Sequence, residues 1–134
     1  MVATISNFTA LVIEDDQLIS ELLVFLLNRE GFKVLEVNDG REAKSTIASL
    51  QIHPEIILLD IMLPFSDGFD LLKDIRNKSG WESVPVIMLS AKSQGYDIAR
   101  AFELGATDYM VKPFQPKELI ARIKRVCKNK KSHA

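Results

Sequence analysis

The sequence has very little cysteine and almost no excess of charge. Cys127 is its single cysteine, so no disulfide can form within the chain, which fits a reducing compartment. The formal net charge of -1 argues against a general affinity for nucleic acid or membranes. Every charged residue after Glu118 is basic, but a basic helix end is more often solvated than bound to DNA.

Long hydrophobic runs are also absent. No apolar stretch is long enough to span a membrane, and the N-terminus lacks the basic start of a secretory signal. A chain of 134 residues, 47% of them hydrophobic, is long enough for one domain with its own core but too short for two. We therefore expect a single soluble, cytoplasmic domain.

Short apolar runs alternate with longer amphipathic segments, which is typical of a parallel sheet covered by helices on both faces. The runs predict strands near residues 9–13, 33–37, 55–59, 85–89 and 107–111. The segments between and after them predict helices near residues 16–29, 39–50, 67–77, 94–104 and 116–129. The first helix carries a broad apolar stripe that should face the core, made of Leu18, Ile19, Leu22, Leu23, Leu26 and Leu27.

Several residues mark where helices should begin and end. One of the later acids of Glu14-Asp15-Asp16 is a plausible N-cap for the first helix, and Gly31 should stop that helix. Pro116 suits the first position of the last helix. That helix would turn an apolar face inward, formed by Leu119, Ile120, Ile123, Val126 and Cys127.

Three of the apolar runs end in charged residues. Ala10–Ile13 leads into Glu14-Asp15-Asp16, Ile56–Leu59 into Asp60, and Tyr109–Val111 into Lys112. The carboxyl ends of parallel strands meet at one edge of the sheet, where ligands bind in open α/β folds. Carboxylates gathered there would repel each other by roughly a few kcal/mol per pair. The pattern therefore predicts a site that holds a divalent cation beside a phosphoryl group.

Four motifs carry a resemblance to a known family. They are LVIEDD at residues 11–16, LLDIMLP at 58–64 followed by Asp67-Gly68, VPVIMLSA at 84–91 and GATDYMVKPF at 105–114. With these motifs in this order, the chain resembles the receiver domain of two-component response regulators. The resemblance implies a doubly wound, five-stranded parallel sheet flanked by five helices, with strand order 2-1-3-4-5. It covers residues 9–129 and leaves 1–8 as an N-terminal extension and 130–134 as a polar tail.

The resemblance also implies a role for each polar residue of the site. Asp60 would accept a phosphoryl group from the phosphohistidine of a sensor histidine kinase or phosphotransfer protein. Lys112 and Ser90 would bind the phosphoryl oxygens, Ser90 and Tyr109 would form a switch, and the Lys112-Pro113 bond would be cis. The domain would be a regulatory phosphoacceptor that assists its own phosphorylation and dephosphorylation, not an enzyme. The implied Mg²⁺ ligands are Glu14 or Asp15, Asp60 and the backbone carbonyl of Met62.

These residue types suit that chemistry. An ionised, exposed carboxylate fixed at a strand end can attack phosphorus. Mg²⁺ prefers oxygen ligands and keeps several waters, so two or three protein oxygens are enough. The Lys112 ammonium acts as a point charge on one phosphoryl oxygen. The Ser90 hydroxyl can donate to another and draw its loop inward only when phosphate is present.

The same residues also allow simpler structural roles and other functions. Taken alone, Asp60 would be a cap or turn carboxylate, Lys112 a solvated lysine and Tyr109 a half-buried core aromatic. A dehalogenase-like phosphatase would need a second acid where Met62 stands, and a nucleotide or flavin binder would need a Gly-rich loop after the first strand. The alternative that remains is a receiver-shaped module that binds a partner without phosphorylation.

Two residues bear on how long a phosphoryl group would last. Met62 lies two positions after Asp60, and Lys92 two positions after Ser90. Some receivers carry groups at these positions that orient a hydrolytic water, but neither residue here is a good general base. We therefore expect slow self-dephosphorylation.

Partners should dock on the face formed by the fourth helix, fifth strand and fifth helix. The chain looks most similar to receivers joined to winged-helix DNA-binding domains, in which this face forms a symmetric dimer through charge pairs. Asp108 and Arg122 match one such pair, whereas Ile98 stands where a basic partner for Glu118 would be expected. We expect a possible phosphorylation-dependent homodimer, no direct nucleic acid binding by this domain and no membrane contact.

Overall fold

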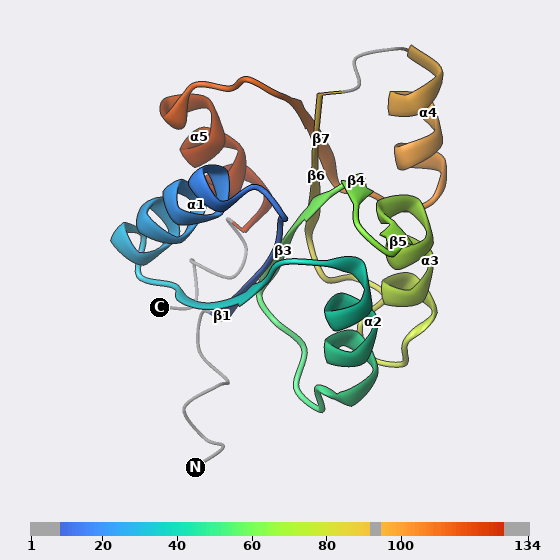
Figure 1. Ribbon diagram of the computed structural model, residues 1–134. Coiled ribbons are helices and arrows are strands. Elements are labelled where there is room, and N and C mark those ends of the chain that lie inside the picture. Colours follow the sequence, from blue (N-terminus) through green and yellow to red (C-terminus); the bar gives the residue numbers. More distant parts are fainter. Residues whose placement is uncertain (1–8, 92–94, 128–134) are drawn as a thin grey trace.

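The computed structural model describes residues 9–91 and 95–127 and is built on a five-stranded parallel sheet (Figure 1). The strands of this sheet are β1 (Thr9–Ile13), β2 (Lys33–Val37), β3 (Ile56–Asp60), β6 (Val86–Ser90) and β7 (Asp108–Val111). Their order is β2-β1-β3-β6-β7, and all four neighbouring pairs are parallel. Since β6 and β7 are the fourth and fifth strands of this sheet along the chain, the expected order 2-1-3-4-5 is confirmed.

Within the described part of the chain, five helices cover the two faces of the sheet. They are α1 (Gln17–Arg29), α2 (Gly40–Ser49), α3 (Gly68–Asn77), α4 (Gly95–Glu103) and α5 (Pro116–Val126). Helices α1 and α5 lie on one face, and α2, α3 and α4 lie on the other (Figure 1). Alternate residues of β1 divide between the two cores, because Val12 packs in the cluster that holds Leu23 of α1, while Ile13 packs with Leu72 of α3.

The predicted elements are all present, and most of their bounds agree within one residue. The last helix is shorter than predicted, because α5 ends at Val126 with Cys127 as its C-cap, while residues 128 and 129 lie outside the described part of the chain. The expected extension at 1–8 and tail at 130–134 also lie outside it. The sequence did not predict a short antiparallel hairpin made of β4 (Met62–Leu63) and β5 (Ser66–Asp67).

The helix ends follow the expected local chemistry. The Asp16 side chain accepts a hydrogen bond from the backbone N–H of Ile19 at 3.1 Å and so caps α1. After this helix Gly31 adopts a φ of 93°, a left-handed conformation that glycine adopts without strain. Pro116 occupies the first position of α5, as predicted.

The predicted apolar stripe of α1 is wrong in part. Leu23, Leu26 and Leu27 are buried, but Leu18 is 78% exposed and Leu22 is 36% exposed. The leucines spread over a wider arc of the helix than the sheet and α5 can cover. Within the described residues, no helix is both long and apolar enough to cross a membrane.

Candidate functional site

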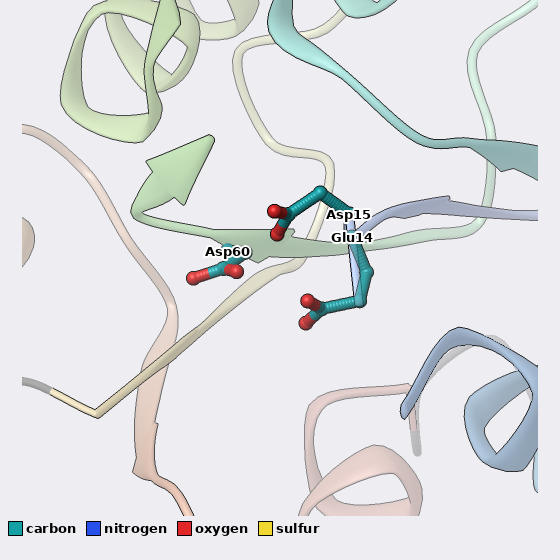
Figure 2. A group of neighbouring side chains, drawn as sticks. All are labelled: Glu14, Asp15 and Asp60. Atoms are coloured by element: carbon teal, nitrogen blue, oxygen red, sulfur yellow. The ribbon is translucent and has the colours of Figure 1, made fainter. Parts of the chain in front are cut away.

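Three carboxylates meet at the ends of two neighbouring strands. Glu14 and Asp15 follow β1 directly, and Asp60 is the last residue of β3. Because β1 and β3 pair in parallel, with Ile13 opposite Leu59, these residues reach the same edge of the sheet. One oxygen from each carboxylate lies within 4.8 Å of the others (Figure 2). The convergence predicted from the strand ends is confirmed.

The three carboxylates differ in burial. Glu14 is fully buried and Asp60 is 4% exposed, whereas Asp15 is exposed. The expectation that Asp60 would be exposed is therefore wrong, because β3 is the middle strand of the sheet and neighbouring elements enclose its end. Asp15 is the member of the group that opens to solvent.

Lys112 joins two of these carboxylates. Its Nζ lies 2.8 Å from Oε1 of Glu14 and 3.2 Å from Oδ2 of Asp60. Burial lowers the pKa of Lys112, but the bonds to Glu14 and Asp60 outweigh this effect and raise the pKa overall. The lysine is therefore a fixed positive charge at neutral pH. The Lys112-Pro113 bond is cis, as the resemblance implied.

The pKa of Glu14 is strongly shifted by its surroundings in the site. Burial, together with the charge of Asp60, raises its pKa from 4.5 to about 7, while Lys112 and the backbone N–H of Asp16 act in the opposite direction. Near neutral pH this carboxyl group is therefore only partly ionised. A divalent cation beside it would favour the ionised form.

Ser90 and Tyr109 are brought together on the two strands beyond β3. Ser90 ends β6 and is fully buried, while Tyr109 of β7 is 6% exposed. The two side chains share a hydrogen bond, and burial raises the pKa of Tyr109. Ser90 lies on the strand next to Asp60, since Asp60 pairs with Leu89. The predicted switch residues are thus in contact with each other at the same edge.

Met62 lies on the outer side of the site. Its backbone N–H donates a hydrogen bond to Oδ1 of Asp60 at 3.2 Å, and its side chain is exposed. Lys92, the other residue expected beside the phosphoryl group, lies outside the described residues.

Sequence reasoning missed two residues that position the site. A Cβ atom at Gly68 would collide with the carbonyl oxygen of Asp60, so this glycine lets α3 pack against the end of β3. Its place in the Asp67-Gly68 motif was a signal. The side-chain amide of Asn38 donates to the backbone carbonyl of Glu14 at 3.0 Å, and no sequence pattern pointed to that contact.

The donor set suits a small, hard divalent cation. All three converging groups are carboxylates, and oxygen is the ligand that Mg²⁺ prefers in proteins. The Lys112 ammonium contacts two of these carboxylates, Glu14 and Asp60, so positive charge is available from the protein as well. The arrangement can bind an anionic group next to a nucleophilic carboxylate.

Comparison with known proteins identifies relatives over most of the chain. A family model described as the response regulator receiver domain matches residues 10–124. The DNA-binding response regulator MtrA of Mycobacterium tuberculosis H37Rv is 41% identical over 114 residues, which are 85% of this chain and 48% of that protein. The phosphate regulon transcriptional regulatory protein PhoB of Escherichia coli K12 is 41% identical over 116 residues, 87% of this chain and 50% of that protein. The chain thus spans about half the length of these two relatives.

Solved structures share the same architecture. The receiver domain of the Francisella response regulator 1452 superposes with a TM-score of 0.81 at 31% identity, covering 92% of this chain and 99% of that one. The BeF3-activated N-terminal receiver domain of RstA from Klebsiella pneumoniae superposes with a TM-score of 0.77 at 30% identity, covering 89% and 97%. Sequence and structure comparisons therefore agree.

Proposed function

The chain belongs to the response regulator receiver family, and from that premise we propose that it is the phosphoacceptor domain of a two-component system. One observation carries the proposal. Asp60 ends the middle strand of the sheet, within reach of two further carboxylates and of the Lys112 ammonium. This is the arrangement that lets a carboxylate take up a phosphoryl group without a prohibitive gathering of negative charge.

Asp60 is the proposed nucleophile. One of its carboxylate oxygens attacks the phosphorus of a phosphohistidine on a sensor histidine kinase or phosphotransfer protein. The new O–P bond forms as the N–P bond breaks, which leaves an acyl phosphate on Asp60 and returns the imidazole to the donor. Lys112 Nζ, now 3.2 Å from Asp60, would bind one phosphoryl oxygen.

The metal ligands proposed are Glu14, Asp15, Asp60 and the backbone carbonyl of Met62. Mg²⁺ bound there would neutralise the charge of the carboxylates and of the phosphoryl oxygens. The protein's own part is to hold these oxygens close together before the donor arrives, which it does through adjacent strand ends and the Asn38 contact to Glu14.

Ser90 and Tyr109 would report the phosphoryl group to the surface. The Ser90 hydroxyl would donate to a phosphoryl oxygen, and Tyr109 would follow because the two side chains already share a hydrogen bond. The phosphoryl group adds about -1.5 to -2 charges, by analogy with phosphoserine. The change would reach the face formed by α4, β7 and α5, where we propose that partners dock.

We also propose that this face forms a homodimer when Asp60 is phosphorylated, which requires its charge pairs to exchange between chains. Arg122 Nη1 contacts Asp108 at 2.9 Å, and Arg122 Nη2 contacts Glu118 at 3.0 Å, both within one chain. A dimer that uses the Asp108 and Arg122 pair between chains would have to break these bonds. The mass in solution, measured with and without a beryllofluoride phosphate mimic, would show whether the exchange occurs.

The phosphorylated form should be long-lived. The Met62 side chain is 59% exposed beside Asp60 and offers no proton acceptor to a hydrolytic water. We predict that the acyl phosphate persists for minutes or longer at neutral pH with Mg²⁺, as followed by loss of the phosphorylated mass. A half-life of seconds would contradict this.

Intact-protein mass spectrometry tests the proposed function. The chain is incubated with acetyl phosphate and Mg²⁺, and we expect the mass of one added phosphoryl group, which chelation of the metal should prevent. Asp60→Asn should abolish the gain. Asp16→Asn is the matched control, because asparagine also caps a helix and the residue stands two positions from Glu14. No gain in the unmodified chain would favour a phosphorylation-independent interaction module.

The cellular setting follows from the same proposal. A phosphohistidine donor of a two-component system acts in the cytoplasm, so we place the chain there. Its relatives are named as DNA-binding and transcriptional regulators, and this domain would control such an output without touching DNA itself.

A further inference from the structure

A second feature lies next to the carboxylate site. A cleft of about 1000 Å³ opens between the β4–β5 hairpin, the start of α3 and α4. It reaches Asp15 and Met62 at one end and Tyr96 of α4 at the other. The cleft is therefore continuous with the surroundings of Asp60, but most of its lining takes no part in the proposed phosphoryl transfer.

The cleft is acidic, and its basic residues already have partners. Lys44 is paired with Asp74, outside the lining, at 2.8 Å. The Arg100 guanidinium lies over the ring of Phe69, 4.4 Å from the ring centre. The acidic residues of the lining outnumber these two cations, and they are Asp15, Asp67, Asp70 and Asp97. The surface is thus complementary to a positively charged ligand.

Asp97 is the most informative of these acids. It is 5% exposed, yet it contributes to the wall of the cleft. A positively charged group that enters the cleft would be attracted to this carboxylate and to the three other aspartates of the lining.

Aromatic side chains stand at both sides of the cleft. Phe65 is 69% exposed and Tyr96 is 72% exposed, although aromatic residues of this size are usually buried. Phe65 adopts a φ of 72°, and the Arg41 guanidinium lies 4.1 Å from its ring centre. The ring is thus held on the outside of the hairpin, where it can pack against a bound molecule.

We propose that this cleft binds a basic segment of a partner protein. An arginine or lysine of that segment reaches Asp97, and apolar side chains beside it pack on Phe65 and Tyr96. The volume exceeds what one side chain fills, and the exposed rings call for apolar groups that a metal ion or a small polyamine lacks. A segment bound here stands over Met62 and so limits the access of water to Asp60.

Nuclear magnetic resonance on the full chain, without Mg²⁺ or a phosphodonor, tests the proposal. The probe is a synthetic peptide in which leucine and arginine alternate, and the control peptide carries glutamate in place of arginine. We expect the arginine peptide to shift the amide resonances of Asp67, Tyr96 and Arg100, with an affinity that falls as NaCl is added. The glutamate peptide should leave these resonances unchanged.

Matched variants separate a specific site from general attraction. Asp97→Asn should weaken binding of the arginine peptide by about fivefold or more. Glu21→Gln removes the same charge from the exposed surface of α1 and should leave the affinity unchanged. Asp70→Asn, at an exposed position of the cleft, should also weaken binding, and it keeps the test valid if Asp97→Asn fails to fold.

Three results would overturn the proposal. They are absence of binding at millimolar peptide, resonance shifts concentrated outside the cleft, and equal loss of affinity in Asp70→Asn and Glu21→Gln. Binding should survive in Asp60→Asn. A chain that binds the peptide but takes up no phosphoryl group therefore contradicts the proposed function alone, and the opposite result contradicts this inference alone.

Discussion

Glu14 shows how burial of one residue sets the charge of the whole site. It is fully enclosed, touches Lys112 at 2.8 Å and faces Asp60, and its pKa rises to about 7. The pKa of Lys112 is also raised, so the lysine stays protonated across the physiological pH range. Without a bound cation at neutral pH, a partly ionised Glu14 therefore lies beside a protonated Lys112.

The raised pKa of Glu14 makes a signed prediction for the metal-free protein. Between its unfolded value of 4.5 and its folded value of about 7, the folded state binds more protons than the unfolded state. The free energy of unfolding should therefore fall as pH rises through this window, by on the order of 2 kcal/mol, and then level off. Urea denaturation at pH 5 and at pH 8 measures the change.

The control is Glu14→Gln, which cannot ionise. The difference in unfolding free energy between the native chain and this variant should shrink or change sign as pH rises. Added Mg²⁺ should stabilise the native chain more at pH 8 than at pH 5, because its ligand must be ionised. A difference that is independent of pH would show that Glu14 titrates normally.

At the scale of elements, most of the site could be predicted from where the strands end. The charged residues that follow or end β1, β3 and β7 could be placed at one edge from the apolar runs alone, and their convergence is observed. Burial could not be obtained in the same way. Leu18 and Leu22 continue the apolar pattern of α1 but lie outside the arc that the sheet covers, and a pattern does not reveal how wide that arc is.

Neighbouring leucines of α1 should respond differently to truncation. Leu23→Ala should lower the free energy of unfolding by about 2–5 kcal/mol, because this side chain is fully buried. Leu22→Ala, at a position 36% exposed, should lower it far less, by about 1 kcal/mol or below. Chemical denaturation of the two variants compares them directly. Equal losses would mean that the exposed row is packed in solution.

The contact between α3 and the end of β3 makes a further prediction. Gly68→Ala should push the carbonyl group of Asp60 away, lower stability by about 1–3 kcal/mol and slow the phosphorylation of Asp60 by acetyl phosphate. Gly95→Ala is the matched control, since a Cβ at the first residue of α4 meets nothing within 4 Å. If Gly68→Ala took up the phosphoryl group at the native rate, this packing would not position the site.

At the scale of the whole molecule, one half-buried cation joins segments that are far apart in sequence. Arg76 of α3 donates hydrogen bonds to the carbonyl oxygens of Val84 at 2.7 Å, Gly105 at 2.8 Å and Trp81 at 3.2 Å. Burial lowers its pKa. Thus the loops that lead into β6 and β7 are both tied to the end of α3, and nothing in the local sequence around Arg76 predicts this.

Replacing this arginine should affect the whole fold. Arg76→Met leaves three carbonyl groups without their donor and should lower the free energy of unfolding by about 2–4 kcal/mol. Arg29→Met, at an exposed position of α1, should change it by about 0.5 kcal/mol or less. Thermal and urea unfolding measure both. A small effect of Arg76→Met would mean that water replaces the guanidinium without loss.

The amount that could be predicted also depends on scale. The doubly wound fold follows from alternating patterns that every element repeats, so single exceptions such as Leu18 do not disturb it. The β4–β5 hairpin escaped prediction because its strands have two residues each and show no periodicity. The cleft beside it depends on where α4 lies relative to that hairpin, which is a property of packing that no short motif carries.

The position of β3 between β1 and β6 makes the centre of the sheet more rigid than its edge. Every residue of β3 is buried, and the strand is hydrogen-bonded on both sides, so its amides should be among the slowest to exchange with deuterium. Tyr109 belongs to β7, which has a neighbour on one side only. The proposed nucleophile is therefore anchored on the central strand, whereas the proposed switch tyrosine lies on an edge strand that has fewer hydrogen bonds to break.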